Sequence, residues 1–160
     1  MTTPLPTPKA VRDLLLDLLG RNVEVAIGDA YAPKPKEPAT LAVFVDDGLR
    51  TRAVIALDLD LSAYAAAAIG LIPVGGAEAA IEDAELSPLL QENLGEVLNI
   101  CGSLLNAEGH PHVKLHATYP PGAATPSDVP GFAAILGNRL DLVVDVTGYG
   151  KGKLSIVGAP

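Results

Sequence analysis

The sequence has few aromatic residues, and this narrows the kinds of ligand that it can bind. Only 4% of its 160 residues are aromatic, and none is tryptophan. Proteins stack bases and sugars on aromatic rings, so binding of nucleic acid or carbohydrate by stacking is disfavoured. Because 49% of the residues are apolar, the core has to consist of Leu, Val, Ile and Ala, which favours strands packed on helices.

Positive charge and cysteine are also scarce. The 11 Lys and Arg residues stand against 19 Asp and Glu residues, which gives a formal net charge of −8. A surface of this sign repels phosphate backbones, so nucleic acid is excluded as an expected partner. The single cysteine, Cys101, cannot form an internal disulfide, which favours the cytoplasm. We find no apolar run long enough to span a membrane and expect no secretory signal.

Hydrophobic periodicity and turn residues predict three helices and six strands. Residues 1–7, rich in Thr and Pro, are expected to form a flexible tail, and residues 8–160 a single domain. The predicted helices are 8–19, 63–71 (begun by Asp60 or Ser62) and 88 to about 108. The predicted strands are 23–27, 41–45, 51–59, 112–118, 140–146 and 153–157. This order indicates an α+β fold: a mostly antiparallel six-stranded sheet with three helices packed on it.

The longest predicted helix carries one polar stripe that lacks Lys and Arg. On a helical wheel its apolar residues gather on one side, and a narrow arc on the other side holds Glu92, Glu96, Asn99, Ser103 and Asn106. Two glycines flank this arc, although each costs about 1 kcal/mol relative to Ala inside a helix. The stripe is either an ordinary solvated face or a surface that another molecule approaches closely. Those glycines are Gly95 and Gly102.

A family resemblance favours the second interpretation. Residues 92–106 read Glu-Asn-Leu-Gly-Glu-Val-Leu-Asn-Ile-Cys-Gly-Ser-Leu-Leu-Asn and resemble the signature helix of the CheC/CheX/FliY chemotaxis phosphatases. That pattern has an acidic or Ser residue, a Glu four residues later, an Asn three further on, and then a Gly. The order of elements agrees over roughly residues 8–157. Glu92 stands where Asp or Ser is more usual, and the first helix lacks a second Glu-x-x-Asn, which points to the single-site CheX arrangement.

The resemblance implies a protein aspartyl-phosphate phosphatase that acts on a phosphorylated, CheY-like response-regulator receiver domain. It implies that Glu96 docks to the receiver Lys and that Asn99 orients the attacking water. The rest of the stripe and its glycines would contact the partner: Glu92, Gly95, Gly102, Ser103 and Asn106. The resemblance implies no cofactor of the chain's own, with Mg²⁺ carried by the receiver.

Two other functions stay open beside the phosphatase. One is a non-catalytic receiver-binding or dimerisation module of the same fold. The other is a small-molecule pocket beneath the Pro/Gly/Ala-rich loop 120–137, in which Ser127 and Asp128 are the notable polar groups. We also expect a homodimer through sheet strands, because edges of short apolar strands such as 41–45 and 51–59 have to be covered.

Several smaller patterns have structural explanations. His110, His112 and His116 lack a further Cys or carboxylate that would complete a metal site, so no metal is expected. Cys101 falls on the apolar side of its helix and is expected in the core. The segment 148–153, Gly-Tyr-Gly-Lys-Gly-Lys, precedes a strand and not a helix, which indicates a hairpin turn. Asp58 and Asp60 are expected only to solvate a strand end.

Overall fold

The chain folds around one sheet of six antiparallel strands, as the computed structural model, which describes residues 2–160, shows. The strand order is β1-β5-β6-β3-β2-β4. The bounds are β1 Val23–Ile27, β2 Ala39–Val45, β3 Thr51–Asp58, β4 Lys114–Tyr119, β5 Arg139–Val146 and β6 Gly150–Gly158. The predicted α+β class and the six-stranded antiparallel sheet are confirmed.

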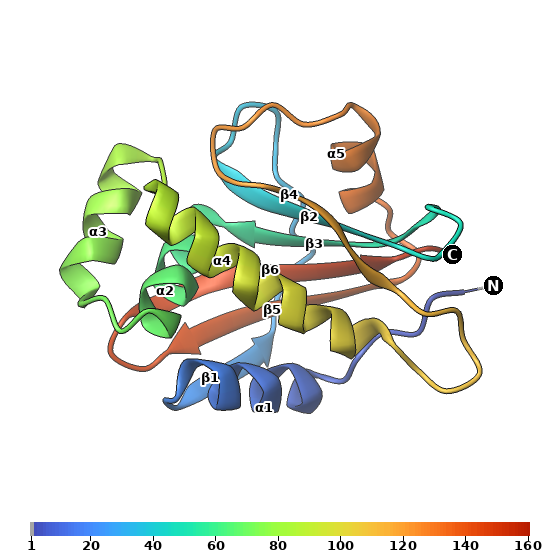
Figure 1. The fold of residues 1–160 in the computed structure, drawn as a ribbon, viewed down its shortest axis with the longest axis horizontal. Coiled ribbons are helices and arrows are strands. Elements are labelled where there is room, and N and C mark those ends of the chain that lie inside the picture. Colours follow the sequence, from blue (N-terminus) through green and yellow to red (C-terminus); the bar gives the residue numbers. More distant parts are fainter. Residues whose placement is uncertain (1) are drawn as a thin grey trace.

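Helices cover one face of this sheet (Figure 1). Three of them, α1 (Pro8–Leu19), α2 (Leu59–Ile69) and α4 (Pro88–Cys101), enclose the main core against the strands. Their buried apolar residues meet those of β2, β3, β5 and β6. The largest fully buried side chains there include Phe44, Ile55, Leu61, Leu94, Leu98, Leu142 and Ile156.

Side-chain caps fix where these helices begin. The Thr7 hydroxyl accepts a hydrogen bond from the Ala10 N–H at 3.1 Å, and each of α1 and α4 has a proline in its first turn. For α2 the cap is Asp58, whose carboxylate accepts from the Leu61 N–H at 2.9 Å. The expectation that Asp58 merely solvates a strand end is therefore wrong. Strand β3 runs directly into α2, so the helix begins at Leu59 and not at residue 60 or 62.

The number of helices differs from the prediction. Residues 2–160 contain five α-helices and the 3₁₀ segment η1 (Gly102–Leu105), where three helices were predicted. The two additional helices are α3 (Val74–Asp83) and the short α5 (Asp128–Ala133). Both contain helix-breaking residues near their starts, Gly75 and Gly76 in α3 and Pro130 and Gly131 in α5, so their sequences resemble turns. The long helix ends at Cys101 and not near residue 108, because the chain tightens into η1.

The glycine-rich segment before the last predicted strand is itself part of β6. The structure places Gly150 and Gly152 in β6, opposite Val146 and Val144 of β5, where we had predicted a turn. A Cβ on Gly152 would lie 2.6 Å from the Leu61 nitrogen. Glycine is therefore required where β6 passes the first turn of α2.

The N-terminal segment is held against the fold. Of the expected flexible tail 1–7, residues 2–7 are described, and Met1 lies outside the described residues. The Thr3 N–H donates to the Ala159 carbonyl at 3.0 Å, and the Asn138 amide donates to the Thr3 carbonyl at 2.8 Å. Thr3 is buried by these contacts, so this end of the tail is anchored beside the end of β6.

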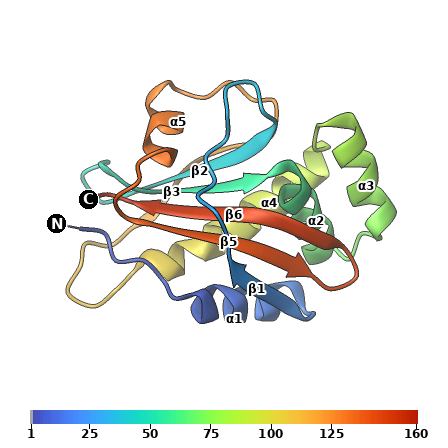
Figure 2. The ribbon, with the colours of Figure 1, turned by 180° about the vertical axis from the view of Figure 1, so that it is seen from behind.

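The other face of the sheet is covered by irregular chain (Figure 2). Residues 28–38 cross it, and α5 packs beside them on a second, smaller cluster. Arg139 ties these parts together through hydrogen bonds to the carbonyls of Tyr31, Ala133 and Ile135. Its guanidinium also pairs with Asp141 at 2.8 Å. No helix within residues 2–160 is long and apolar enough to cross a membrane.

Strand positions correct one expectation about self-association. Strands β2 and β3, which contain the predicted hairpin strands, both lie inside the sheet with a neighbour on each side. They therefore offer no free edge to a second copy. The strands at the two edges are β1 and β4.

Candidate functional site

Helix α4 combines a fully buried face with an exposed one. Its Ser87 cap and Pro88 begin it, and its apolar residues then face the core at helical spacing. The buried residues are Leu90, Leu94, Val97, Leu98 and Cys101. Since this face is fixed by packing, the orientation of the opposite face is fixed as well. The helix thus provides a rigid support for whatever its outer residues do.

Glu96 and Asn99 lie on the exposed face of α4, as does Glu92. A separation of three residues places Glu96 and Asn99 about 4.5 Å apart along the axis and about 60° apart around it. Within residues 2–160 neither side chain takes part in a hydrogen bond or ion pair. An unengaged carboxylate and an unengaged amide therefore stand side by side toward solvent.

At the C-terminal end of the predicted stripe, the side chains make hydrogen bonds within the chain. The Ser103 hydroxyl donates back to the Ile100 carbonyl at 2.9 Å. The Asn106 amide donates to the Val113 carbonyl at 3.0 Å, and its oxygen accepts from the Val113 N–H at 2.7 Å. Asn106 thus fastens the end of η1 to the chain entering β4. Partner contacts by Ser103 and Asn106 stay a prediction, and the Asn106 amide already has partners within the chain.

The two glycines beside the stripe have different surroundings. A Cβ on Gly95 would meet nothing within 4 Å, whereas Gly102 is buried and a Cβ there would lie 3.6 Å from the Phe44 ring. Only Gly95 therefore leaves open surface next to Glu96. Such surroundings are expected of a glycine at which another molecule approaches the helix backbone closely.

Replacing Gly95 by alanine measures how much this glycine lowers the stability of the fold. We expect Gly95→Ala to stabilise the fold by about 0.5–1 kcal/mol, because alanine favours the helix and no atom obstructs its methyl group. Urea unfolding followed by circular dichroism measures this change. A lower unfolding midpoint in Gly95→Ala would show that the added methyl group is obstructed.

One positioning residue was missed in the sequence. The Asn93 amide donates to the Ala66 carbonyl of α2 at 3.1 Å. A Cβ on Gly70 would lie 2.5 Å from the Asn93 nitrogen, so Gly70 leaves the space that this amide needs. The contact fixes α4 against α2 one turn before Glu96. No local pattern reveals it, because its two partners are far apart in sequence.

A shallow groove of about 390 Å³ begins at Asn99 and extends toward β4. It lies between the end of α4 and the chain leading into that strand. The residues that line it are Asn99, Ile100, Gly102, Ser103, Asn106, His112, Val113, Lys114 and Leu115.

The remaining candidates from the sequence are placed as follows. No group of three His, Cys, Asp or Glu side chains in residues 2–160 could hold a metal ion, and His110, His112 and His116 are each exposed. Cys101 is buried in the core as predicted, and burial raises the pKa of its thiol to about 12. The thiol is therefore protonated at neutral pH and a poor nucleophile.

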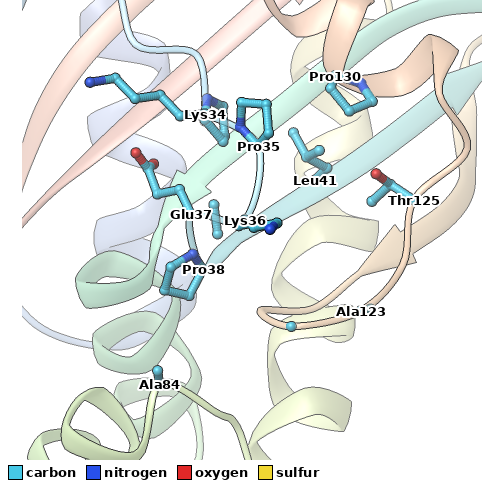
Figure 3. A pocket seen from close by; sticks show the side chains of 13 residues that line it. Lys34, Pro35, Lys36, Glu37, Pro38, Leu41, Ala84, Ala123, Thr125 and Pro130 are labelled. Atoms are coloured by element: carbon cyan, nitrogen blue, oxygen red, sulfur yellow. The ribbon is translucent and has the colours of Figure 1, made fainter.

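A larger hollow of about 620 Å³ lies on the opposite face of the sheet (Figure 3). The connection 33–39 and the loop 122–130 border it, which is where the sequence left a small-molecule pocket open. The expected polar groups Ser127 and Asp128 do not line it. Lys34, Lys36, Glu37 and Thr125 supply its polar side chains, and Glu37 accepts a hydrogen bond from the Tyr31 hydroxyl.

Comparisons with known proteins bear on the fold. No protein-family model and no curated protein sequence matches the chain. Among solved structures, the chain is similar to FliY from Thermotoga maritima, with 18% identity, a TM-score of 0.59, and coverage of 96% of this chain and 85% of that one. It is also similar to the FliM middle domain from Vibrio alginolyticus, with 15% identity, a TM-score of 0.57, and coverage of 94% and 88%.

A third similar structure is the CheX–CheY–BeF₃–Mg²⁺ complex from Borrelia burgdorferi, with 14% identity, a TM-score of 0.51, and coverage of 93% and 92%. The chain is thus an α+β protein of the architecture found in flagellar and chemotaxis proteins. In particular, it has the CheX-like fold that residues 92–106 predicted.

Proposed function

We propose that this chain is a phosphatase that hydrolyses the aspartyl phosphate of a CheY-like receiver domain. The observation that carries the proposal is the pair Glu96 and Asn99, exposed and unengaged on the outer face of a helix whose other face is buried. Open space beside Gly95 adds room for a partner. The fold is shared with a CheX that was solved together with CheY.

The two side chains have complementary roles in this proposal. The Glu96 carboxylate pairs with a receiver lysine and so fixes the helix on the partner. The Asn99 amide reaches the phosphoryl group and orients a water in line with the bond that breaks. An amide suits this task because it both donates and accepts while staying neutral beside an anion. Positioning of this kind supplies most of the catalysis in phosphoryl transfer.

The reaction needs no metal site in this chain. Water attacks the phosphorus, the bond to the receiver aspartate breaks, and inorganic phosphate and the free carboxylate result. Mg²⁺ bound to the receiver would neutralise charge on the phosphoryl oxygens. In this proposal the chain contributes only Glu96 and Asn99 to the chemistry, and it acts in the cytoplasm, where we expect its partner.

The test is the loss of phosphate from purified CheY-like receiver domains that have been phosphorylated with acetyl phosphate in Mg²⁺. We expect the chain to accelerate this loss by at least about tenfold for its partner receiver, which corresponds to about 1.4 kcal/mol of barrier. The spontaneous loss from each receiver alone is the control. The proposal would be contradicted if the chain accelerated phosphate loss from none of the receiver domains of its own organism.

The alternative is a non-catalytic binding module. The same fold occurs in FliM structures from Helicobacter pylori that contain FliG or SpeE as a partner, so it also occurs in proteins solved as complexes. Receiver binding without faster phosphate loss would favour this alternative. The unengaged Asn99 amide favours the enzyme, because binding alone does not require it.

A homodimer through sheet strands is a further part of the proposal. It has to use β1 or β4, the two edge strands, because β2 and β3 are already paired on both sides. Because β4 lines the groove that begins at Asn99, a dimer that leaves the Glu96–Asn99 face free would pair through β1. Light scattering at tens of micromolar measures the mass, and a monomer there would contradict a dimer.

A further inference from the structure

The hollow on the face of the sheet away from α4 has one wall from the connection 33–39 and another from the loop 122–130 (Figure 3). Its volume of about 620 Å³ falls within the range of small-molecule sites, which is about 300–1,000 Å³. Apolar residues supply most of its lining: Pro33, Pro35, Pro38, Ala39, Leu41, Ala84, Ala123 and Pro130. A hollow of this composition suits a ligand with an apolar body.

One buried ion pair holds both walls in place. Arg139, which pairs with Asp141, donates to the Tyr31 carbonyl at 2.8 Å, just before the first wall. The same guanidinium donates to the carbonyls of Ala133 and Ile135 at 3.0 and 2.9 Å, just after the second wall. The fold therefore preforms the hollow, which reduces the cost of ordering the walls around a ligand.

Two polar side chains on opposite walls are unengaged. Within residues 2–160 neither the Lys36 ammonium nor the Thr125 hydroxyl takes part in a hydrogen bond or ion pair. In Figure 3 the Lys36 nitrogen lies on the side of its loop that faces Ala123 and Thr125, and Leu41 lies between the two walls. A cation and a hydroxyl donor thus border the same hollow above an apolar floor.

The carboxylate at the hollow has a different partner. Among residues 2–160, Glu37 is the only acidic residue that lines the hollow. Its carboxylate accepts a hydrogen bond from the Tyr31 hydroxyl at 2.8 Å, and in Figure 3 it points away from Thr125, as the Lys34 side chain does. Lys36 therefore supplies a single positive charge on the side toward Thr125.

We propose that this hollow binds a small organic carboxylate with an apolar body, and that Lys36 and Thr125 hold the carboxylate. One ammonium matches the single charge of a carboxylate, and the hydroxyl donates a further hydrogen bond. The apolar body packs on Leu41 and the prolines beside it. This site is independent of the proposed phosphatase activity, because Glu96 and Asn99 belong to the helix layer on the other face of the sheet.

The experiment titrates the isotope-labelled full chain with phenylbutyrate and follows the amide chemical shifts by NMR. We expect shifts in residues 33–39 and 122–130 and a Kd of about 1 mM or below. Phenylbutyramide has the same apolar body without the charge and should bind about fivefold more weakly. Inorganic phosphate has charge without an apolar body and should bind at least about tenfold more weakly.

Substitutions assign the binding to named groups. Lys36→Asn removes the charge, and the unfolding midpoint should be unchanged because asparagine tolerates the backbone φ of 69° at this position. This variant should bind phenylbutyrate about fivefold more weakly and phenylbutyramide as the wild type does. Thr125→Val should weaken phenylbutyrate binding about threefold. The control is Lys151→Asn, which changes an exposed lysine of β6 outside the hollow and should leave the Kd unchanged.

Four results would overturn the proposal. Phenylbutyrate might shift no amide of the two walls, or phenylbutyramide might bind as tightly as phenylbutyrate, in which case the charge of Lys36 contributes nothing. Phosphate that binds as tightly as phenylbutyrate would show that the apolar lining has no part in binding. An equal loss in Lys36→Asn and Lys151→Asn would show an effect of net charge alone. The proposed phosphatase would stand after any of these results.

Discussion

Replacing Asn99 by alanine is expected to reduce stimulated dephosphorylation by about 100-fold or more, because the attacking water loses the group that orients it. Binding of the BeF₃-bearing receiver should stay within about twofold of the wild type, since the side chain contributes a short amide at the centre of the surface. Glu96→Ala should weaken both binding and turnover, because it removes the docking charge. Phosphate release and titration of labelled receiver measure the two quantities.

The matched control is Asn22→Ala. Asn22 is an exposed asparagine before β1, at the opposite edge of the sheet from β4. The substitution removes the same kind of side chain without changing α4, so the rate of stimulated dephosphorylation should be unchanged. An Asn99→Ala protein that retains most of its activity would show that Asn99 does not position the water, even if the chain is a phosphatase.

The largest expected loss of stability comes from Arg139. This side chain is 8% exposed and its partner Asp141 is 10% exposed. Arg139→Met should lower the unfolding free energy by about 3–5 kcal/mol, because it leaves the Asp141 carboxylate buried without its partner. It also frees the carbonyls of Tyr31 and Ala133 that Arg139 binds. Urea unfolding followed by circular dichroism measures the change.

The same pair predicts how stability depends on pH. Burial acts to raise the pKa of Asp141, but hydrogen bonds from Arg139, Ser155 and the Tyr31 N–H outweigh it and lower the pKa below its ordinary value. A carboxyl of this kind stabilises the fold above its unfolded pKa of about 3.9, and this contribution is lost as the pH falls through the folded pKa. The decrease in stability below about pH 4 should therefore be smaller in Asp141→Asn.

The surface pair Lys9–Asp13 provides the control for this pair. Its side chains are 74% and 47% exposed, so Asp13→Asn should hardly change the unfolding midpoint at neutral pH. A midpoint shift as large as that of Arg139→Met would show that the burial of Arg139 is not what makes its pair important.

The sheet and helix α4 could be predicted because their signals are local. The run of apolar residues at helical spacing from Leu90 to Cys101 and the Ser87–Pro88 start fix α4. The same wheel gave the exposed positions of Glu96 and Asn99. Beyond Cys101 the predicted α-helix was wrong, because the chain tightens into a 3₁₀ turn and the exposed Asn106 binds Val113.

The positioning contacts could not be predicted, because they join residues distant in sequence. The Asn93 amide of α4 binds the Ala66 carbonyl of α2, and Arg139 of β5 binds the Tyr31 carbonyl in the segment that crosses the sheet. The helix α3 was missed for another reason: its Gly75 and Gly76 disfavour an isolated helix, and packing of Ala77 and Ala80 in the core compensates. Tertiary contacts determine whether such segments form helices.

The strand order also fixes when the fold can assemble during synthesis. The edge strand β1 pairs with β5, and β3 pairs with β6. Both β5 and β6 leave the ribosome after the other four strands. While residues 23–138 emerge, β1 therefore has no partner strand, and the apolar faces of α1 and β3 are only partly covered. The nascent chain must keep these surfaces from associating with other proteins until β5 and β6 arrive and complete the sheet.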